Sequence, residues 1–240
     1  RTQYVMTDNV TERKHADKYC FGCGWGIRGY KGASIKDLEQ RLKQTELEKE
    51  KGTKYAGLKL PTDFSYNIPS EPLEWLWRYG ITNAEIYQHK LGWSPQDERL
   101  VFPVFDSFGN LLMYQGRFFG DGSSGRPKYL TRGLSDACYC ILGANSSTIV
   151  AVEDYVSAIK VSRVLTSICL FGSQLSIQRI RTLSDRFNKL VLWLDKDKQV
   201  YSHKAAFRAS PYFDEVLSVV TDLDPKEYST NDIRRTILGS

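Results

Sequence analysis

The chain has 240 residues, of which 41% are hydrophobic and 25% are charged. This composition is ordinary for a globular protein with one large or two small domains. Its longest apolar runs are about five residues, far below the roughly 20 that a membrane-spanning helix needs. No secretory leader is visible, so we predict a cytoplasmic protein without membrane contact. The net charge of +5 fits a polyanionic partner but does not require one.

The first 33 residues are irregular and rich in glycine. They contain Tyr19-Cys20-Phe21-Gly22-Cys23-Gly24, which has the form of one knuckle of a zinc ribbon. A tetrahedral zinc site needs four ligands, and only Cys20 and Cys23 lie here, with His15 as a weaker candidate. Zn²⁺ would therefore bind only if residues further upstream complete the site. The other three cysteines, Cys138, Cys140 and Cys169, are predicted to be ordinary buried thiols.

Residues 34–135 predict a small mixed α+β subdomain. Its predicted helices cover residues 34–52, 71–79 and 82–88. Gly80 is expected to end the helix at residues 71–79, and Thr82 to cap the helix that follows. Two apolar runs, at residues 99–105 and 111–118, flank a short connector that contains glycine and asparagine, which predicts a β-hairpin.

Residues 136–240 predict a second domain in which strands and helices alternate. The strands are expected near residues 148–152, 166–171, 190–194 and 216–220, and the helices near residues 154–165, 175–187 and 201–210. Alternation of this kind predicts an α/β fold with a mostly parallel sheet flanked by helices.

Carboxylates follow three of these predicted strands, and those after the strand at residues 216–220 are Asp222 and Asp224. Asp195 and Asp197 come after the apolar run at residues 190–194, and Glu153 follows the run at residues 148–152. Alternation along the strand predicts that both aspartates lie on one face, where they can converge on a divalent cation, with Lys196 pointing to the other face. Ligands of α/β sheets gather beyond the carboxyl ends of the strands, and oxygen ligands suit Mg²⁺ or Mn²⁺ better than Zn²⁺. The pattern therefore predicts metal-assisted phosphoryl or nucleotidyl transfer.

Three motifs in this region resemble the toprim fold, which DnaG-type primases, topoisomerases and some nucleases share. They are Val152-Glu153-Asp154-Tyr155, Leu170-Phe171-Gly172-Ser173 and Leu194-Asp195-Lys196-Asp197. The family has glycine where this chain has Asp154, and Ser157 fills the place of a later Asp or Ser. The resemblance implies that Glu153, Asp195 and Asp197 are catalytic metal ligands.

The flanking segments resemble the primase part of bacteriophage primase-helicases. These segments are Trp75-Leu76-Trp77-Arg78-Tyr79-Gly80, Gln115-Gly116-Arg117 and Pro127-Lys128-Tyr129-Leu130-Thr131-Arg132-Gly133, followed by Asp224-Pro225-Lys226-Glu227. The resemblance implies that Asp224 is a further metal ligand. It also implies that Arg117, Lys128 and Arg132 contact the nucleotide or the template. In this family, a zinc ribbon at the start helps to read the template.

We therefore expect a DNA primase that makes short RNA primers from ribonucleoside triphosphates on a single-stranded DNA template, with Mg²⁺ or Mn²⁺. The chain has no Gly-x-x-x-x-Gly-Lys-Ser/Thr loop and so no helicase motor of that type, and a replicative helicase is a candidate partner. If the protein is viral, its expected location is the cytoplasm of the host cell. Two alternatives stay open. The same acids serve a toprim-type metal-dependent nuclease, and a non-catalytic replication-associated binding module would need no catalytic metal.

Overall fold

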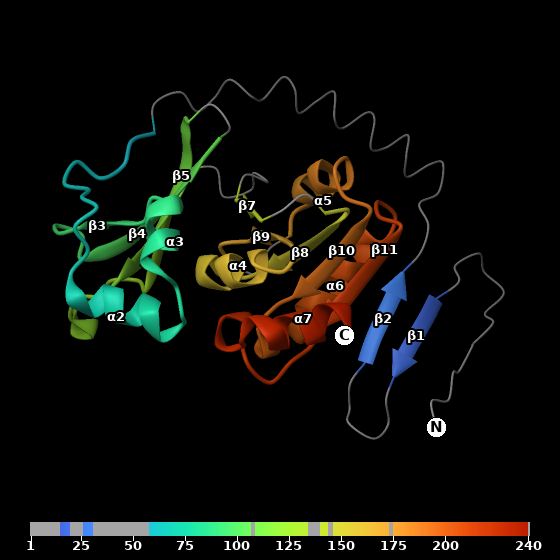
Figure 1. Cartoon of the computed structure of the whole chain (residues 1–240). Helices are drawn as coiled ribbons and strands as arrows, with labels where there is room; N and C mark the ends of the chain where they lie inside the picture. Colours follow the sequence, from blue (N-terminus) through green and yellow to red (C-terminus); the bar gives the residue numbers. More distant parts are fainter. Residues whose placement is uncertain are drawn as a thin grey trace. The chain divides into compact units, whose positions relative to one another are not determined.

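In the computed structural model of the chain, two compact units are formed (Figure 1). The structure describes residues 15–19 and 26–30 by their backbone, and residues 58–106, 109–133, 140–143, 146–172 and 175–239 with their side chains. One unit spans Gly52–Cys140, and the other joins Arg1–Lys51 to Ile141–Ser240. The predicted boundary after residue 135 lies close to the division after Cys140. Of the predicted zinc-ribbon-like segment at residues 1–33, only residues 15–19 and 26–30 are described, and they form strands of the unit that contains the C-terminal part of the chain. The predicted helix at residues 34–52 lies outside the described residues.

The Gly52–Cys140 unit, which we call the N-terminal subdomain, contains an antiparallel sheet with two helices. The sheet has the strand order β3-β4-β5-β6. Its strands are β3 (Gly92–Ser94), β4 (Arg99–Phe105), β5 (Leu111–Phe118) and β6 (Tyr129–Gly133), and its helices are α2 (Ser70–Arg78) and α3 (Asn83–Gln88). A 3₁₀ turn, η1 (Gly122–Ser124), lies between β5 and β6. The predicted hairpin is confirmed, with Leu100 opposite Arg117 in its register.

Local sequence signals end one helix of this subdomain and start the next. Gly80 has a φ of +71°, a left-handed conformation that glycine adopts without steric cost, and it follows α2 as predicted. Thr82 caps α3 through a reciprocal pair of hydrogen bonds with Glu85, a capping box. Both helix boundaries are therefore fixed by residues that the sequence analysis had singled out.

The other unit, which we call the α/β unit, is built on a larger sheet with the strand order β1-β2-β11-β10-β8-β9-β7. The strands β8, β9, β10 and β11 pair in parallel, and the edge strands β7 and β2 pair antiparallel to their neighbours. The strands are β1 (His15–Tyr19), β2 (Gly26–Tyr30), β7 (Ile141–Leu142), β8 (Thr148–Val152), β9 (Thr166–Cys169), β10 (Lys189–Trp193) and β11 (Glu215–Val219). The helices are α4 (Tyr155–Ser162), α5 (Ile177–Ser184), α6 (Gln199–Ala209) and α7 (Thr230–Leu238), with 3₁₀ turns η2 (Lys196–Lys198) and η3 (Pro225–Glu227).

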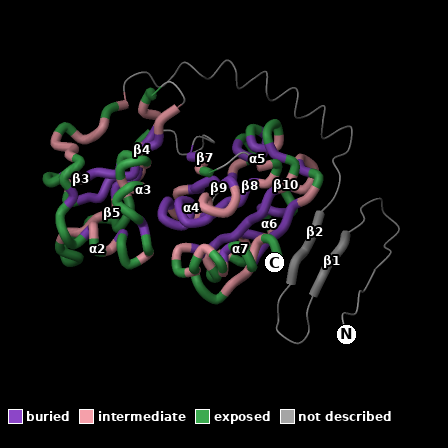
Figure 2. Tube along the Cα trace, in the orientation of Figure 1, coloured by how far each residue is buried: buried purple, intermediate pink, exposed green. Residues whose placement is uncertain are grey.

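The helices of the α/β unit cover both faces of its sheet. From β8 the chain moves to β9 on one side, whereas β10 lies on the other side of β8. Right-handed crossovers therefore place α4 on one face and α5 and α6 on the opposite face. Contacts of α4 with α7 and of α5 with α6 agree with this division. The core lies between these layers, where β8, β9 and β10 are almost wholly buried (Figure 2).

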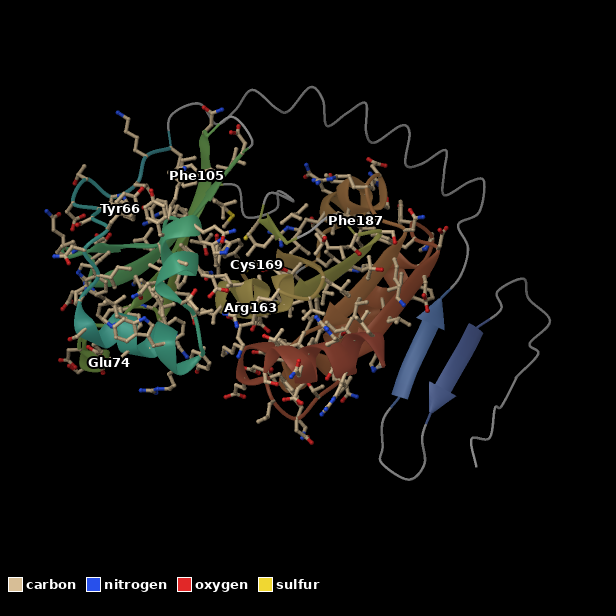
Figure 3. The ribbon with its side chains drawn as sticks, in the orientation of Figure 1. Tyr66, Glu74, Phe105, Arg163, Cys169 and Phe187 are labelled. Carbon is tan, nitrogen blue, oxygen red and sulfur yellow. The ribbon has the colours of Figure 1, made fainter. Side chains whose placement is uncertain are left out.

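Two of the three cysteines that were predicted to be buried lie among the described residues. Cys140 and Cys169 are buried, as predicted, and Cys169 lies at the end of β9 in the α/β unit (Figure 3). Cys20, Cys23 and Cys138 lie outside the described residues. Among the described residues, no helix is long and apolar enough to cross a membrane.

The prediction that Asp195 and Asp197 share one face of a strand is wrong. The strand β10 ends at Trp193, and Lys196–Lys198 form the 3₁₀ turn η2 with Asp195 at its N-cap. Alternation of side chains holds only for extended backbone, so it does not apply across this turn. Asp197 is exposed, whereas Asp195 is half-buried. Lys196 does not point away from the acids, because its ammonium binds Asp222 at the end of the neighbouring strand β11.

Candidate active site

Glu153 and Asp195 flank the point where the strand order of the α/β sheet reverses. Glu153 directly follows β8, Asp195 comes two residues after the end of β10, and these strands are parallel neighbours with Leu192 opposite Ala151. The chain leaves β8 toward one face of the sheet and leaves β10 toward the other. Such a switch point leaves a crevice beyond the carboxyl ends of the two strands, where α/β proteins bind ligands.

Burial and mutual repulsion set the charge state of these two carboxyl groups. Burial raises the pKa of Asp195 to about 7, and the negative charges of Glu153 and Asp224 contribute to this rise. Burial also raises the pKa of Glu153, although Lys198 opposes that change. Glu153 Oε2 and Asp195 Oδ1 are buried and have no hydrogen-bond partner within the described part of the chain. Two desolvated acceptor atoms therefore lack a cation or a donor.

The exposed acids around this pair already have lysine partners. Lys198 Nζ lies 2.7 Å from Asp197 Oδ2, and Lys196 Nζ lies 2.6 Å from Asp222 Oδ1. The carboxylates of both pairs are largely exposed to solvent. Pairs of this kind contribute little free energy and exchange readily, so Asp197 is able to turn to another cation.

Lys226 makes a different, largely buried contact with two acids. Its Nζ lies 2.6 Å from Asp224 Oδ2 and 3.2 Å from Asp154 Oδ2. Burial alone would lower the pKa of Lys226, but the carboxylates of Asp154 and Asp224 raise it well above its usual value. Asp154 is also the N-cap of α4, where its side chain accepts hydrogen bonds from the backbone N–H and the hydroxyl of Ser157.

The unpaired oxygens of Glu153 and Asp195 are of the kind that a divalent cation binds. Within the described residues, no three His, Cys, Asp or Glu side chains gather closely enough to hold a metal together. Mg²⁺ commonly binds through one or two carboxylates and completes its shell with water and substrate phosphates. Glu153 and Asp195 would supply such a pair, and a cation between them would also relieve their repulsion.

Several solved structures that resemble this chain are primase cores. A DnaG primase catalytic domain bound to ssDNA superposes with a TM-score of 0.60 at 16% identity, over 84% of this chain and 80% of that chain. An Aquifex aeolicus primase with its zinc-binding and RNA polymerase domains gives a TM-score of 0.58 at 17% identity, over 99% and 81%. A DnaG catalytic core gives 0.54 at 17% identity, over 67% and 68%.

The fold is that of the DnaG primase core. No protein-family model and no curated protein sequence matches the chain. At 16–17% identity, the likeness therefore establishes the fold and leaves the activity to be argued from the side chains.

The cations predicted to contact nucleic acid lie in the N-terminal subdomain, and two of the three are exposed. Lys128 lies just before β6 and Arg132 on it. Arg117, on β5, is packed among aromatic rings: its guanidinium carbon lies 4.1 Å from the centroid of the Trp75 ring, and its Nη1 donates a 2.7 Å hydrogen bond to the hydroxyl of Tyr129. Lys128 and Arg132 are therefore exposed to solvent, whereas Arg117 is held within the aromatic cluster.

The α/β unit thus gathers the predicted acids at one sheet edge and adds lysines that the sequence analysis had not assigned. Glu153 and Asp195 lie together at the switch point. Asp197 is exposed to solvent beside them and pairs with Lys198, and Asp224 pairs with Lys226. The role of Lys226 depends on a contact with Asp154, 72 residues away in the chain. The only sequence signal for it was its position inside the acidic motif at residues 224–227.

Proposed function

We propose that this chain is the catalytic core of a DNA primase, which joins ribonucleoside triphosphates into short RNA primers on a single-stranded DNA template. The observation that carries the proposal is the pair of buried, unpartnered carboxylate oxygens of Glu153 and Asp195 at the switch point of the sheet. The primase-core fold around that pair supports nucleotidyl transfer over other metal-assisted reactions.

In this proposal Glu153 and Asp195 hold Mg²⁺ or Mn²⁺, and Asp197 joins them when it releases Lys198. The bound ion would supply charge stabilisation for the attacking and leaving oxygens of the phosphoryl group. The two carboxylates fix the position of the ion because they emerge from adjacent strands of a rigid sheet. Lys198 lies beside Asp197 and is placed to meet the triphosphate once it is released.

Lys128 and Arg132 would bind the phosphates of the template or of the incoming nucleotide. Both are exposed cations on one strand segment, and one DnaG neighbour was solved with ssDNA. Arg117 would act beside them by holding Trp75 and Tyr129 in place, since aromatic rings next to cations are typical of sites for single-stranded nucleic acid.

Replacing both Lys128 and Arg132 by alanine should weaken binding to single-stranded DNA and make it less sensitive to salt. Each lost phosphate contact should lower the slope of log K against log [salt] by about 0.7. Fluorescence anisotropy with a labelled oligonucleotide at several salt concentrations measures this slope. The matched control removes Lys204 and Arg234, exposed cations on α6 and α7; an equal change in the control would refute the assignment.

Incubation with a single-stranded template, labelled ribonucleotides and Mn²⁺ tests the activity. A primase produces short oligoribonucleotides that depend on the template and the metal. Shortened template without new RNA would identify a nuclease that uses the same acids. Template binding without either product would identify a binding module, and each of these two outcomes would refute the primase proposal.

The proposal also covers the class of primase, its protein partner, its location in the cell and a zinc site. We place the chain with the primase part of bacteriophage primase-helicases, with a replicative helicase as partner and the host cytoplasm as its location. Zn²⁺ would bind through Cys20 and Cys23 if upstream residues complete a ribbon. These features rest on the sequence motifs, because Cys20 and Cys23 lie outside the described residues.

A further inference from the structure

The half-buried acids at the carboxyl edge of the α/β sheet fall into two groups according to their partners. Glu153 and Asp195 keep buried oxygens without any partner in the described part of the chain. Asp154 and Asp224 share the ammonium group of Lys226, at 3.2 Å and 2.6 Å. One group therefore lacks a cation, and the other contains one that belongs to the protein.

Lys226 is held through both its side chain and its backbone. Only 16% of its side chain is exposed, against 65% for Lys196 and 35% for Lys198. The backbone carbonyl of Lys226 accepts a 2.8 Å hydrogen bond from Nζ of the buried Lys160 on α4. Lys226 therefore cannot swing into solvent as the two exposed lysines can.

The two acids that Lys226 bridges are also fixed by their own segments. Asp154 is bound to Ser157 as the cap of α4. Asp224 caps the turn η3, in which Glu227 binds back to its backbone N–H. The carboxylate of Asp154 already accepts hydrogen bonds from Ser157 and Lys226, so it has little capacity left to bind a metal ion.

We propose that Lys226 is a positioning residue that acts as a built-in cation, in the place where a second metal ion would bridge Asp154 and Asp224. The site consequently takes one tightly bound divalent ion, held by Glu153 and Asp195. This inference rests on the proposed metal-dependent function. Under this proposal Asp224 pairs with Lys226, and the divalent ion binds Glu153 and Asp195.

A count of bound Mn²⁺ ions tests the proposal without any measurement of activity. Titration of the whole chain, followed through the electron paramagnetic resonance signal of free Mn²⁺, gives the number of tight sites. We expect one ion for the parent protein, two for Lys226→Met because two carboxylates are freed, and one for Lys226→Arg because the cation is kept. Two tight ions in the parent, or one in a folded Lys226→Met, would overturn the proposal.

A triple variant covers the case in which Lys226→Met does not fold. Asp154→Asn with Asp224→Asn and Lys226→Met removes the whole buried charge group and leaves no unpaired carboxylate behind. This variant should still bind one Mn²⁺; loss of that ion would show that Asp154 or Asp224 is a required ligand and would refute the inference.

An assay of primer synthesis by the parent protein distinguishes a failure of the proposed primase function from a failure of the single-ion inference. One bound ion without primers would contradict the proposed function alone, and primers with two tightly bound ions would contradict the inference alone.

Discussion

Asp195→Asn should reduce metal-dependent primer synthesis by roughly a thousandfold, because the loss of a metal ligand removes several kcal/mol of transition-state stabilisation. The same substitution should stabilise the metal-free protein. Burial and the neighbouring carboxylates raise the pKa of Asp195 to about 7, so its ionised form is less favourable in the folded chain than in the unfolded one. Since the side chain is partly exposed, we expect a gain of about 1–2 kcal/mol in the free energy of unfolding at pH 8.

The pH dependence of this gain follows from the raised pKa. The folded chain holds the proton of Asp195 up to about pH 7, whereas the unfolded chain releases it near its ordinary value of about 4. The parent therefore loses stability relative to Asp195→Asn as the pH rises from about 4 to about 7, and the difference is complete above that range. Urea denaturation in the presence of a chelator, at several pH values, measures it.

Asp214→Asn is the matched control for this experiment. Asp214 is exposed and lies just before β11, at the opposite edge of the same sheet. It should leave both primer synthesis and its metal dependence unchanged. An Asp195→Asn variant that makes primers at the parental rate, or that is less stable than the parent at pH 8 without metal, would contradict the assignment of Asp195.

Lys226→Met should lower the free energy of unfolding by about 2–3 kcal/mol in the absence of divalent ions. Removing one partner of a buried ion pair leaves an uncompensated charge, which costs about 3–5 kcal/mol when burial is complete. The carboxylates of Asp154 and Asp224 are 19% and 31% exposed, so we expect a value below that range. Urea denaturation followed by circular dichroism gives the difference.

Mn²⁺ should restore much of the stability that Lys226→Met loses, because the freed carboxylates can then share an ion that binds only the folded chain. Lys196→Met is the control, since Lys196 pairs with Asp222 on the surface and its loss should leave stability unchanged. If the two lysine variants behaved alike, the buried contacts of Lys226 would have no special role.

The four parallel strands of the α/β unit could be predicted because each is a short, mostly apolar run, whereas β1, β2 and β7 of the same sheet were not predicted. Leu190, Val191 and Leu192 are completely buried in β10, and a segment of this kind has few alternatives to a central parallel strand. The order of strands and helices along the chain then placed Glu153 and Asp195 at the same edge of the sheet. Local pattern and chain direction were sufficient for this part of the site.

The remaining part of the site depends on turns and on distant contacts, which local patterns do not encode. The backbone turns into η2 directly after β10, so strand alternation gave the wrong orientation for Asp197 and Lys196. The bridge from Lys226 to Asp154 joins two loops that approach each other only when β8 and β11 belong to one sheet. A lysine next to acids in the sequence gives no indication of which acid it will bind.

Anomalous scattering from crystals of the chain grown with Mn²⁺ locates the bound ion. We expect one strong peak within coordination distance of Glu153 Oε2 and Asp195 Oδ1, with Lys226 still bound to Asp154 and Asp224. A peak at Asp154 and Asp224 with Lys226 displaced, or the lack of any peak beside Glu153 and Asp195, would contradict this expectation.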